Sequence, residues 1–126
     1  MNKNKKGLYF LKDKKVKLIT EYNTPDGMGG LETGYRYITN NSLWAYTSQL
    51  SQDLAVKAMS LGTEEKRLFV LNYRDDLKVF DFIEYKGNYY LIVRLDTADD
   101  YNGELFVYVR DAEGEHCPDN VQPAQE

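Results

Sequence analysis

The chain has 126 residues, of which 42% are hydrophobic, a composition typical of one globular domain. Its net charge of −4 is unevenly distributed, because residues 1–17 hold seven lysines against Asp13, a balance of +6, which leaves −10 for the remainder. Its short apolar runs predict neither a membrane-spanning helix nor a secretory signal peptide, and the single Cys117 excludes an internal disulfide.

The charge pattern divides the chain into three parts: a basic N-terminal arm over 1–15, one β domain over 16–110 and a flexible acidic tail over 111–126. The arm is predicted to dock on an acidic protein ring or on nucleic acid, and a solvated terminus explains its charge equally well. The candidate docking residues are Lys3, Lys5, Lys6, Lys12, Lys14 and Lys15.

The first half of the domain is predicted to form a hairpin and a third strand. Residues 16–22 are rich in β-branched and aromatic side chains and end at the turn sequence 23–27, and 32–38 supply the second strand. The link between these strands is a flexible loop of Gly27, Met28, Gly29 and Gly30. Residues 43–46 form the third strand, in which Trp44 is expected to anchor the core.

A helix and four further strands follow. Ser51 is a suitable N-cap, apolar residues recur at helical spacing after it, and Gly62 is a suitable C-terminal residue. Strands are predicted over 67–73, 79–85, 89–95 and 104–110. A tight hairpin is expected at 85–89, because Gly87 and Asn88 tolerate positive backbone angles. These elements favour a mainly β fold: a small antiparallel β-barrel of six to seven strands, with one short helix inserted between the early and late strands.

Residue types that carry chemistry are sparse and poorly placed. His116 is the only histidine, and it lies beside Cys117 in the predicted tail, which is no scaffold for a dyad or a zinc site. The acidic pairs 75–76 and 99–100 fall at turns, where aspartate commonly bonds the local backbone. No catalytic site, metal or cofactor is therefore expected.

Five motifs follow one another in a fixed order between residues 16 and 95. They are Val16-Lys17-Leu18-Ile19-Thr20, the Asp/Gly-rich turn 26–30, Leu43-Trp44-Ala45-Tyr46, the polar stretch 48–58, and the hairpin 82–93. The hairpin fits the form apolar-x-Tyr-x-Gly-x-x-Tyr-x-Ile. In this order the motifs resemble the head-tail connector, or head-closure, family of tailed siphophages, although the lysine-rich start and the acidic extension depart from its pattern.

The resemblance implies a structural protein that joins the portal or adaptor ring of a DNA-filled head to a tail completion or tail terminator protein. It implies self-association into a ring that encloses double-stranded DNA without sequence-specific binding and without membrane contact. The expected location is the cytoplasm of the bacterial host during assembly and the head-tail interface of the virion afterwards.

The resemblance also implies a candidate stopper segment, because some family members close the channel with the stretch after the second strand. Its residues here are Ser48, Gln49, Leu50, Ser51, Gln52, Asp53, Leu54, Lys57 and Met59. A helix in this stretch that covers one end of the barrel explains the pattern as well.

Two other function classes remain open. One is a small-barrel nucleic-acid-binding module that uses the lysine arm and exposed tyrosines. The chain contains 11 tyrosines in total. The other is a hydrolase that uses clustered carboxylates.

Overall fold

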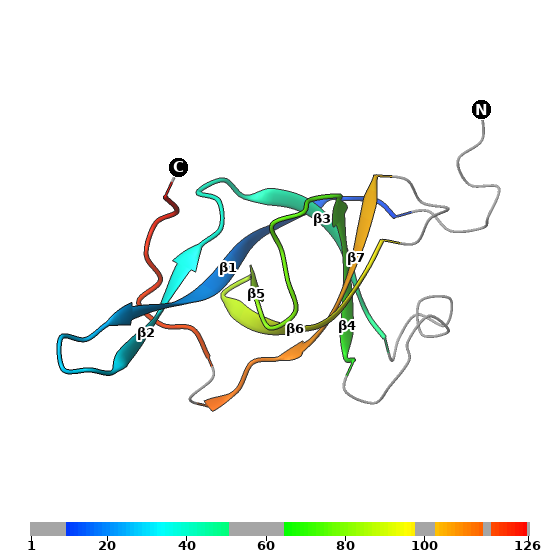
Figure 1. The fold of residues 1–126 in the computed structure, drawn as a ribbon. Helices are drawn as coiled ribbons and strands as arrows, with labels where there is room; N and C mark the ends of the chain where they lie inside the picture. Colours follow the sequence, from blue (N-terminus) through cyan, green and yellow to red (C-terminus); the bar gives the residue numbers. More distant parts are fainter. Residues whose placement is uncertain (1–9, 51–64, 98–102, 115–116, 126) are drawn as a thin grey trace.

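The computed structural model describes residues 10–50, 65–97, 103–114 and 117–125, and these form seven strands (Figure 1). The strands are β1 (Lys14–Pro25), β2 (Leu31–Tyr37), β3 (Leu43–Gln49), β4 (Arg67–Asn72), β5 (Phe82–Tyr85), β6 (Asn88–Asp96) and β7 (Glu104–Asp111). The helix expected over 51–62 lies outside the described residues. Within them, no helix has the length and hydropathy needed to cross a membrane.

The strands form one antiparallel sheet that closes on itself. The sheet order is β2-β1-β3-β4-β7-β6-β5, and a further pairing of β1 with β5 joins the two sides. Six strands therefore make a closed barrel and β2 lies outside it, which confirms the predicted fold class. Closure leaves the six strands without the free edges that invite aggregation.

The long strand β1 contributes both to the barrel and to the β1–β2 hairpin. Its first residues pair with β3 and β5 in the barrel wall, whereas the stretch from Ile19 to Pro25 pairs with β2. The apolar residues Val16 and Leu18 point into the barrel, but the residues after Ile19 are polar or exposed and supply nothing for the core. The β1–β2 hairpin therefore leaves the barrel as an arm, on the left of Figure 1.

The barrel interior is filled by apolar side chains from β1 and β3–β7. Phe69 on β4 is completely buried, and its ring makes edge-to-face contacts with Tyr85 and Tyr90 at centroid distances of 5.7 and 5.6 Å. The stretch Leu68–Leu71 is buried at every position, with alternate residues in the interior and in a second cluster outside β4 and β7. Phe10, just before β1, covers that outer cluster.

The C-terminal segment 117–125 is described along β2, where the sequence predicts a flexible acidic tail. The N–H of Gln122 donates to the Tyr35 carbonyl at 2.8 Å, and the N–H of Tyr37 donates to the Gln122 carbonyl at 2.9 Å. Val121 packs on a third apolar cluster, whose buried members are Ile19, Phe82 and Leu91. The acidic composition of the segment does not predict this contact, because a single apolar residue and backbone hydrogen bonds are enough to attach the segment to β2.

Two local expectations need correction. The hairpin between β5 and β6 is confirmed, but its positive backbone angles are at Lys86 and Gly87, with φ of 52° and 79°, and not at Asn88. Trp44 is 55% exposed and does not anchor the core. It lies between Leu43 and Ala45, which face the barrel interior, so strand alternation turns its ring outward.

Candidate functional site

The tip of the arm is an ordered turn that presents apolar side chains. The carboxylate of Asp26 accepts hydrogen bonds from the N–H groups of Met28 at 2.8 Å and Gly30 at 3.0 Å. These two bonds, the Met28 bond first, lower the pKa of the Asp26 carboxyl below its ordinary value. Met28 is 90% exposed and Leu31 is 68% exposed. The predicted flexible loop is thus closed by Asp26, and its apolar residues point into solvent.

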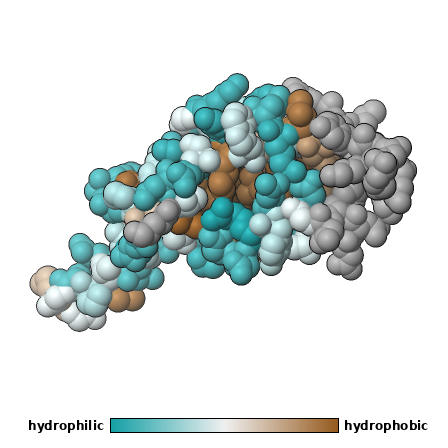
Figure 2. Space-filling model, turned by 90° about the horizontal axis from the view of Figure 1, so that it is seen from above, coloured by the Kyte–Doolittle hydropathy of each residue, from teal (hydrophilic) through white to brown (hydrophobic). Residues whose placement is uncertain are grey.

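The arm is also acidic. Between Lys17 and Arg36 the sequence contains no lysine or arginine, and it contains Glu21, Asp26 and Glu32, a charge of −3. All three acidic residues are exposed. Figure 2 shows the arm projecting to the left with mostly hydrophilic flanks and some apolar atoms near its end. Because it projects from the barrel, the arm is well placed to reach a neighbouring molecule.

A second exposed apolar surface, which we call the Trp44 surface, lies where β1 enters the barrel. It is centred on the Trp44 ring, which is 55% exposed, and on Lys15, which pairs with Trp44 across the β1–β3 ladder. The ammonium of Lys15 lies 5.0 Å from the centroid of the Trp44 ring. The Lys14 ammonium contacts Asp13 at 3.0 Å, and the Lys12 ammonium contacts Glu104 at 2.6 Å. The net charge over residues 11–17 is +3, from four lysines and one aspartate.

The arm is stiffened by a stack of three residues on one of its faces. The Arg36 guanidinium lies 4.0 Å from the centroid of the Tyr22 ring. Tyr22 is paired with Gly34 across the β1–β2 ladder, and a Cβ at Gly34 would lie only 2.7 Å from the Tyr22 ring carbon Cζ. Glycine is therefore required under the ring, since a methyl group would displace it.

We expect Gly34→Ala to lower the free energy of unfolding by about 1–2 kcal/mol, because the methyl group forces the Tyr22 ring off its stack with Arg36. Urea denaturation measures this difference. Gly87→Ala is an informative comparison, because nothing lies within 4 Å of its Cβ and only the positive φ of 79° is unfavourable. If the double variant Tyr22→Ala/Gly34→Ala is as stable as Tyr22→Ala alone, the contact of the methyl group with the Tyr22 ring is the cause of the loss.

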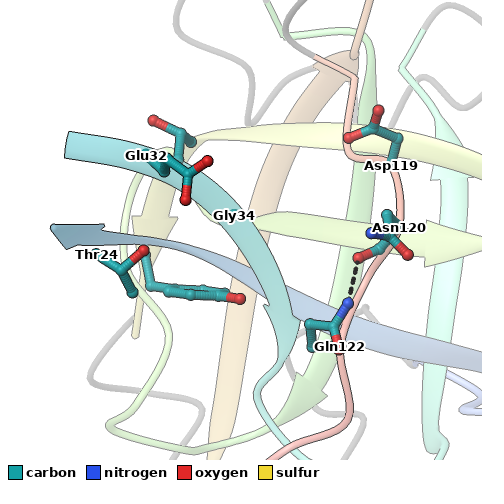
Figure 3. Close-up of a pocket in the computed structure, with 8 residues that line it drawn as sticks. Thr24, Glu32, Gly34, Asp119, Asn120 and Gln122 are labelled. Carbon is teal, nitrogen blue, oxygen red and sulfur yellow. Dashed lines mark hydrogen bonds between the residues drawn. The ribbon is translucent and has the colours of Figure 1, made fainter. Parts of the chain in front are cut away.

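A polar pocket of about 290 Å³ lies between the arm and the C-terminal segment (Figure 3). Its lining residues are Tyr22, Thr24, Glu32, Thr33, Gly34, Asp119, Asn120 and Gln122. Asn120 has a positive φ of 50°, which turns the chain just before Gln122 meets β2. The side-chain amide of Gln122 donates to the Asn120 carbonyl at 3.1 Å. The pocket is thus an open cleft where two chain segments diverge, with acidic groups on both sides.

Tyr37, at the end of β2, connects the arm to the barrel wall. Its hydroxyl donates to the Glu84 carboxylate on β5 at 2.8 Å, and the Lys17 ammonium lies 5.0 Å from its ring centroid. Burial and then the hydrogen bond to Glu84 raise the pKa of Tyr37 to about 12, because both disfavour the phenolate.

The raised pKa predicts a loss of stability in strong base. The contribution of Tyr37 is fully present below about pH 10, the unfolded value, and is lost as the pH rises toward about 12, the folded value. Burial also raises the pKa of Tyr35, Tyr89 and Tyr108, so absorbance titration at 295 nm should show several tyrosines ionising late, and one equivalent of this late absorbance should be lost in Tyr37→Phe. A titration curve that is unchanged in Tyr37→Phe would contradict the assignment.

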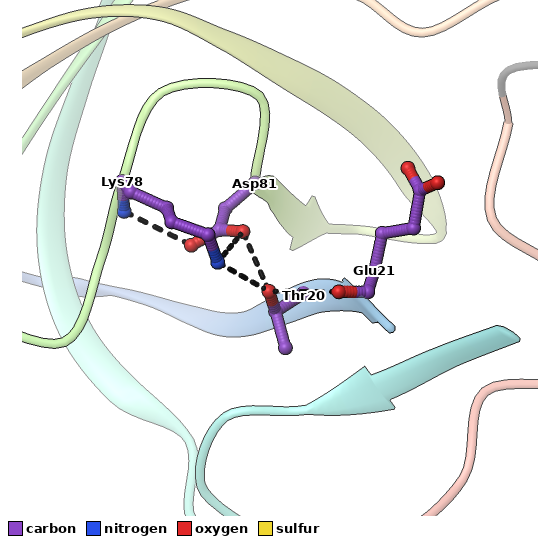
Figure 4. Close-up of polar contacts among 4 residues, drawn as sticks. All are labelled: Thr20, Glu21, Lys78 and Asp81. Atoms are coloured by element: carbon purple, nitrogen blue, oxygen red, sulfur yellow. Dashed lines mark hydrogen bonds and ion pairs between the residues drawn. The ribbon is translucent and has the colours of Figure 1, made fainter. Parts of the chain in front are cut away.

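A buried carboxylate fastens the loop before β5 to β1 (Figure 4). Asp81 is 2% exposed, and its carboxylate accepts hydrogen bonds from the Thr20 hydroxyl at 2.7 Å and from the N–H of Lys78 at 2.9 Å. The Lys78 ammonium contacts the same carboxylate at 3.1 Å. Each carboxylate oxygen thus has a donor, as expected for a structural group.

The residue before this carboxylate has an unusual backbone. Phe80 has φ of 76° and a side chain that is 67% exposed. Its N–H donates to the Ile92 carbonyl at 2.9 Å, and the Ile92 N–H donates to the Asp81 carbonyl at 2.9 Å. This pair of bonds with β6 holds the loop in place and accounts for a strained conformation that costs about 1–2 kcal/mol.

The candidate residues from the sequence are only partly described. Of the stopper segment, Ser48 and Gln49 end β3 and Leu50 follows with 4% exposure, while Ser51, Gln52, Asp53, Leu54, Lys57 and Met59 lie outside the described residues. Of the docking arm, Lys15 lies beside the Trp44 ring, Lys12 contacts Glu104 and Lys14 contacts Asp13, while Lys3, Lys5 and Lys6 lie outside the described residues. The structure thus brings Lys15 next to an aromatic ring that was expected in the core.

The carboxylate and histidine candidates make no assembled metal site within the described ranges. Both oxygens of Asp76 accept hydrogen bonds from the Arg74 guanidinium at 2.7 Å, and Asp75 is exposed. The pair 99–100 and His116 lie outside the described residues. No group of three or more potential ligands is present among those that are described.

Sequence reasoning missed the buried Asp81, although an aspartate between Phe80 and Phe82 in a predicted strand is a detectable signal. The sequence placed Met28 in a loop but did not predict that Asp26 orders this loop around an exposed Met28 side chain.

Comparison with known proteins supports the fold and adds no function. No family model matches this sequence, and no curated protein sequence gives a significant match. A solved structure that is similar is the solution structure of protein SF1141 from Shigella flexneri 2a, a structural genomics target. It is 18% identical with a TM-score of 0.63, and the alignment covers 81% of this chain and 94% of that one. At this identity the likeness shows that the two chains share a fold.

Proposed function

We propose that this chain is a structural assembly protein of a tailed bacteriophage or prophage, which joins the DNA-filled head to the tail. The observation that carries the proposal is its two-ended surface: an acidic arm with an apolar tip, and a basic Trp44 surface at the other end of β1. A compact barrel with two separate contact surfaces suits a protein that is held between other subunits. The order of the motifs resembles that of the head-tail connector family, and this is the reason for proposing the head-tail junction as the assembly.

In this proposal the partners are the portal or adaptor ring on the head side and a tail completion or tail terminator protein on the tail side. Copies of the chain form a ring around the exit channel. The strongly negative charge after residue 17 suits passage of double-stranded DNA, because acidic groups repel phosphates and do not grip them. Closure of the channel by the stretch 48–62 is the finer part of the proposal.

Co-sedimentation of the purified protein with DNA-filled, tailless phage heads tests the proposal. We expect saturable binding and reduced leakage of DNA, in both cases relative to heads alone. Heads that already carry tails are the control, because the docking surface is then covered. Absence of binding to any tailless head, with a folded protein, would overturn the proposal.

A nucleic-acid-binding module is the second candidate, and one observation favours it: the exposed Trp44 ring with the Lys15 ammonium 5.0 Å from its centroid. Exposed aromatic rings beside cations stack on bases of single strands. In that case Trp44 fluorescence is quenched by single-stranded DNA, and the affinity falls steeply as salt is raised. The acidic arm argues against a continuous binding groove.

A further inference from the structure

We infer that the apolar tip of the arm docks on the Trp44 surface of a second copy of this chain, head to tail. The inference rests on the proposed function, since it names the contact by which copies associate in the ring. One partner surface is Met28 with Leu31, and the other is the Trp44 ring with Lys15 beside it. The two surfaces differ, so each copy uses its arm on one neighbour and its Trp44 surface on the other.

The two surfaces lie too far apart to meet within one copy. Both are attached to β1, which has 12 residues, and the Trp44 surface lies at its start and the tip at its end. A strand rises about 3.3 Å per residue, so β1 separates them by roughly 36 Å. Figure 1 shows the arm carried away from the barrel by this strand. An intermolecular contact is therefore the way for the two to pair.

The chemistry of the two surfaces is complementary. The tip has the exposed apolar side chains of Met28 and Leu31, and the other surface has the exposed Trp44 ring, so both gain by mutual burial. The tip is bordered by Asp26 and Glu32, and residues 21–35 contain no positive charge. The Trp44 surface is bordered by Lys15, and the nearby acidic groups Glu104 and Asp13 contact Lys12 and Lys14.

This charge pattern selects one pairing of surfaces. Two tips are both acidic and repel each other, and two Trp44 surfaces are both basic and repel each other. A tip against a Trp44 surface brings opposite charges together around an apolar centre. The head-to-tail arrangement is thus favoured over a symmetric dimer.

The tip is ordered before it binds, which lowers the entropic cost of docking. Two N–H groups bond the Asp26 carboxylate, and the N–H of Asp26 itself donates to the Gly30 carbonyl at 3.1 Å. The ladder of β1 with β2 extends to the pair Pro25 and Leu31, directly at the turn. Met28 is therefore presented on a defined backbone.

Sedimentation velocity over a wide protein concentration range in low salt tests the inference. Wild type should associate with rising concentration, and salt should weaken the association. The arm variant Met28→Asp/Leu31→Asp and the surface variant Lys15→Glu/Trp44→Asp should each lower the association constant at least about tenfold. Tyr73→Asp places one negative charge at another exposed aromatic, 54% exposed, and should associate like wild type.

A mixture of the two variants separates the head-to-tail contact from symmetric contacts. The arm variant keeps an intact Trp44 surface and the surface variant keeps an intact tip, so a one-to-one mixture should form dimers that stop at that size. The arm variant also keeps the only tryptophan, so its emission should shift to shorter wavelength only when the surface variant is added.

Each outcome decides the matter. Dimers in the mixture and none in either variant alone support the inference, and Lys15→Glu alone gives the same result if Trp44→Asp fails to fold. Lack of self-association by wild type, or self-association by either variant at wild-type strength, overturns it. Binding of the arm variant to tailless heads with wild-type stoichiometry overturns the inference and leaves the proposed function intact. Head-to-tail association without any binding to heads contradicts the proposed function alone.

Discussion

Replacing Asp81 by alanine is expected to lower the free energy of unfolding by about 3 kcal/mol. The carboxylate is 2% exposed, and its removal leaves the Thr20 hydroxyl and the Lys78 N–H without the acceptor they use in the folded state. A hydrogen bond to a charged group contributes about 1.5–3 kcal/mol, and two part-buried bonds of this kind are lost here. The ion pair with the Lys78 ammonium adds little, because that side chain is 69% exposed. Urea denaturation monitored by circular dichroism measures the loss.

Two variants serve as controls for Asp81→Ala. Asp76→Ala removes a carboxylate that is 43% exposed and pairs with Arg74 at the surface, so we expect a loss below about 1 kcal/mol. Thr20→Val removes one of the donors and keeps the shape, so it should recover part of the stability when combined with Asp81→Ala. A loss for Asp81→Ala no larger than that for Asp76→Ala would show that the buried network contributes little.

Removing residues 117–126 is expected to destabilise the barrel by about 3 kcal/mol. The truncation uncovers part of Ile19, Phe82 and Leu91, which are 0%, 3% and 8% exposed and pack against Val121. Full exposure of one such side chain costs about 1.5–3 kcal/mol, and here three are partly exposed. Two backbone hydrogen bonds between β2 and Gln122 are lost as well. Thermal and urea unfolding of the truncated chain measure the change.

Truncation after Ala124 is the matched control, because it keeps Val121, Gln122 and the hydrogen bond from the Ala124 N–H to the Asn40 side chain. We expect it to unfold like the full chain. Val121→Asp in the full chain should reproduce most of the loss, since it places a charge on the apolar cluster. Equal stability of the full chain and the chain ending at 116 would mean that the segment is a passive extension.

The strands were predictable from the sequence because they depend on local patterns. Alternating or continuous apolar residues place all seven within a few positions, and the hairpin at Lys86 and Gly87 is specified by its turn residues. The extent of β1 was less accessible, since its last residues, as far as Pro25, become a strand only by pairing with β2.

What escaped prediction depends on contacts between distant segments. Trp44 points outward because its neighbours Leu43 and Ala45 face the core. Side chains alternate between the two faces of a strand, but this alternation alone does not say which face is inside. The cluster that receives Val121 combines residues of β1, β5 and β6. No local feature of the C-terminal segment indicates that such a cluster exists.

The pairing of β1 with β5 sets an order for folding. Thr20 and Asp81, which form a hydrogen bond where β1 meets β5, are 61 positions apart in the chain. The β1–β2 and β5–β6 hairpins can therefore form early, whereas the pairing of β1 with β5 requires the closure of a long loop. Topologies dominated by such distant contacts fold on the order of milliseconds to seconds. During synthesis, a nascent chain that ends before β5 exposes the unpaired edge of β1, and the barrel closes only after β7, the last strand, has left the ribosome.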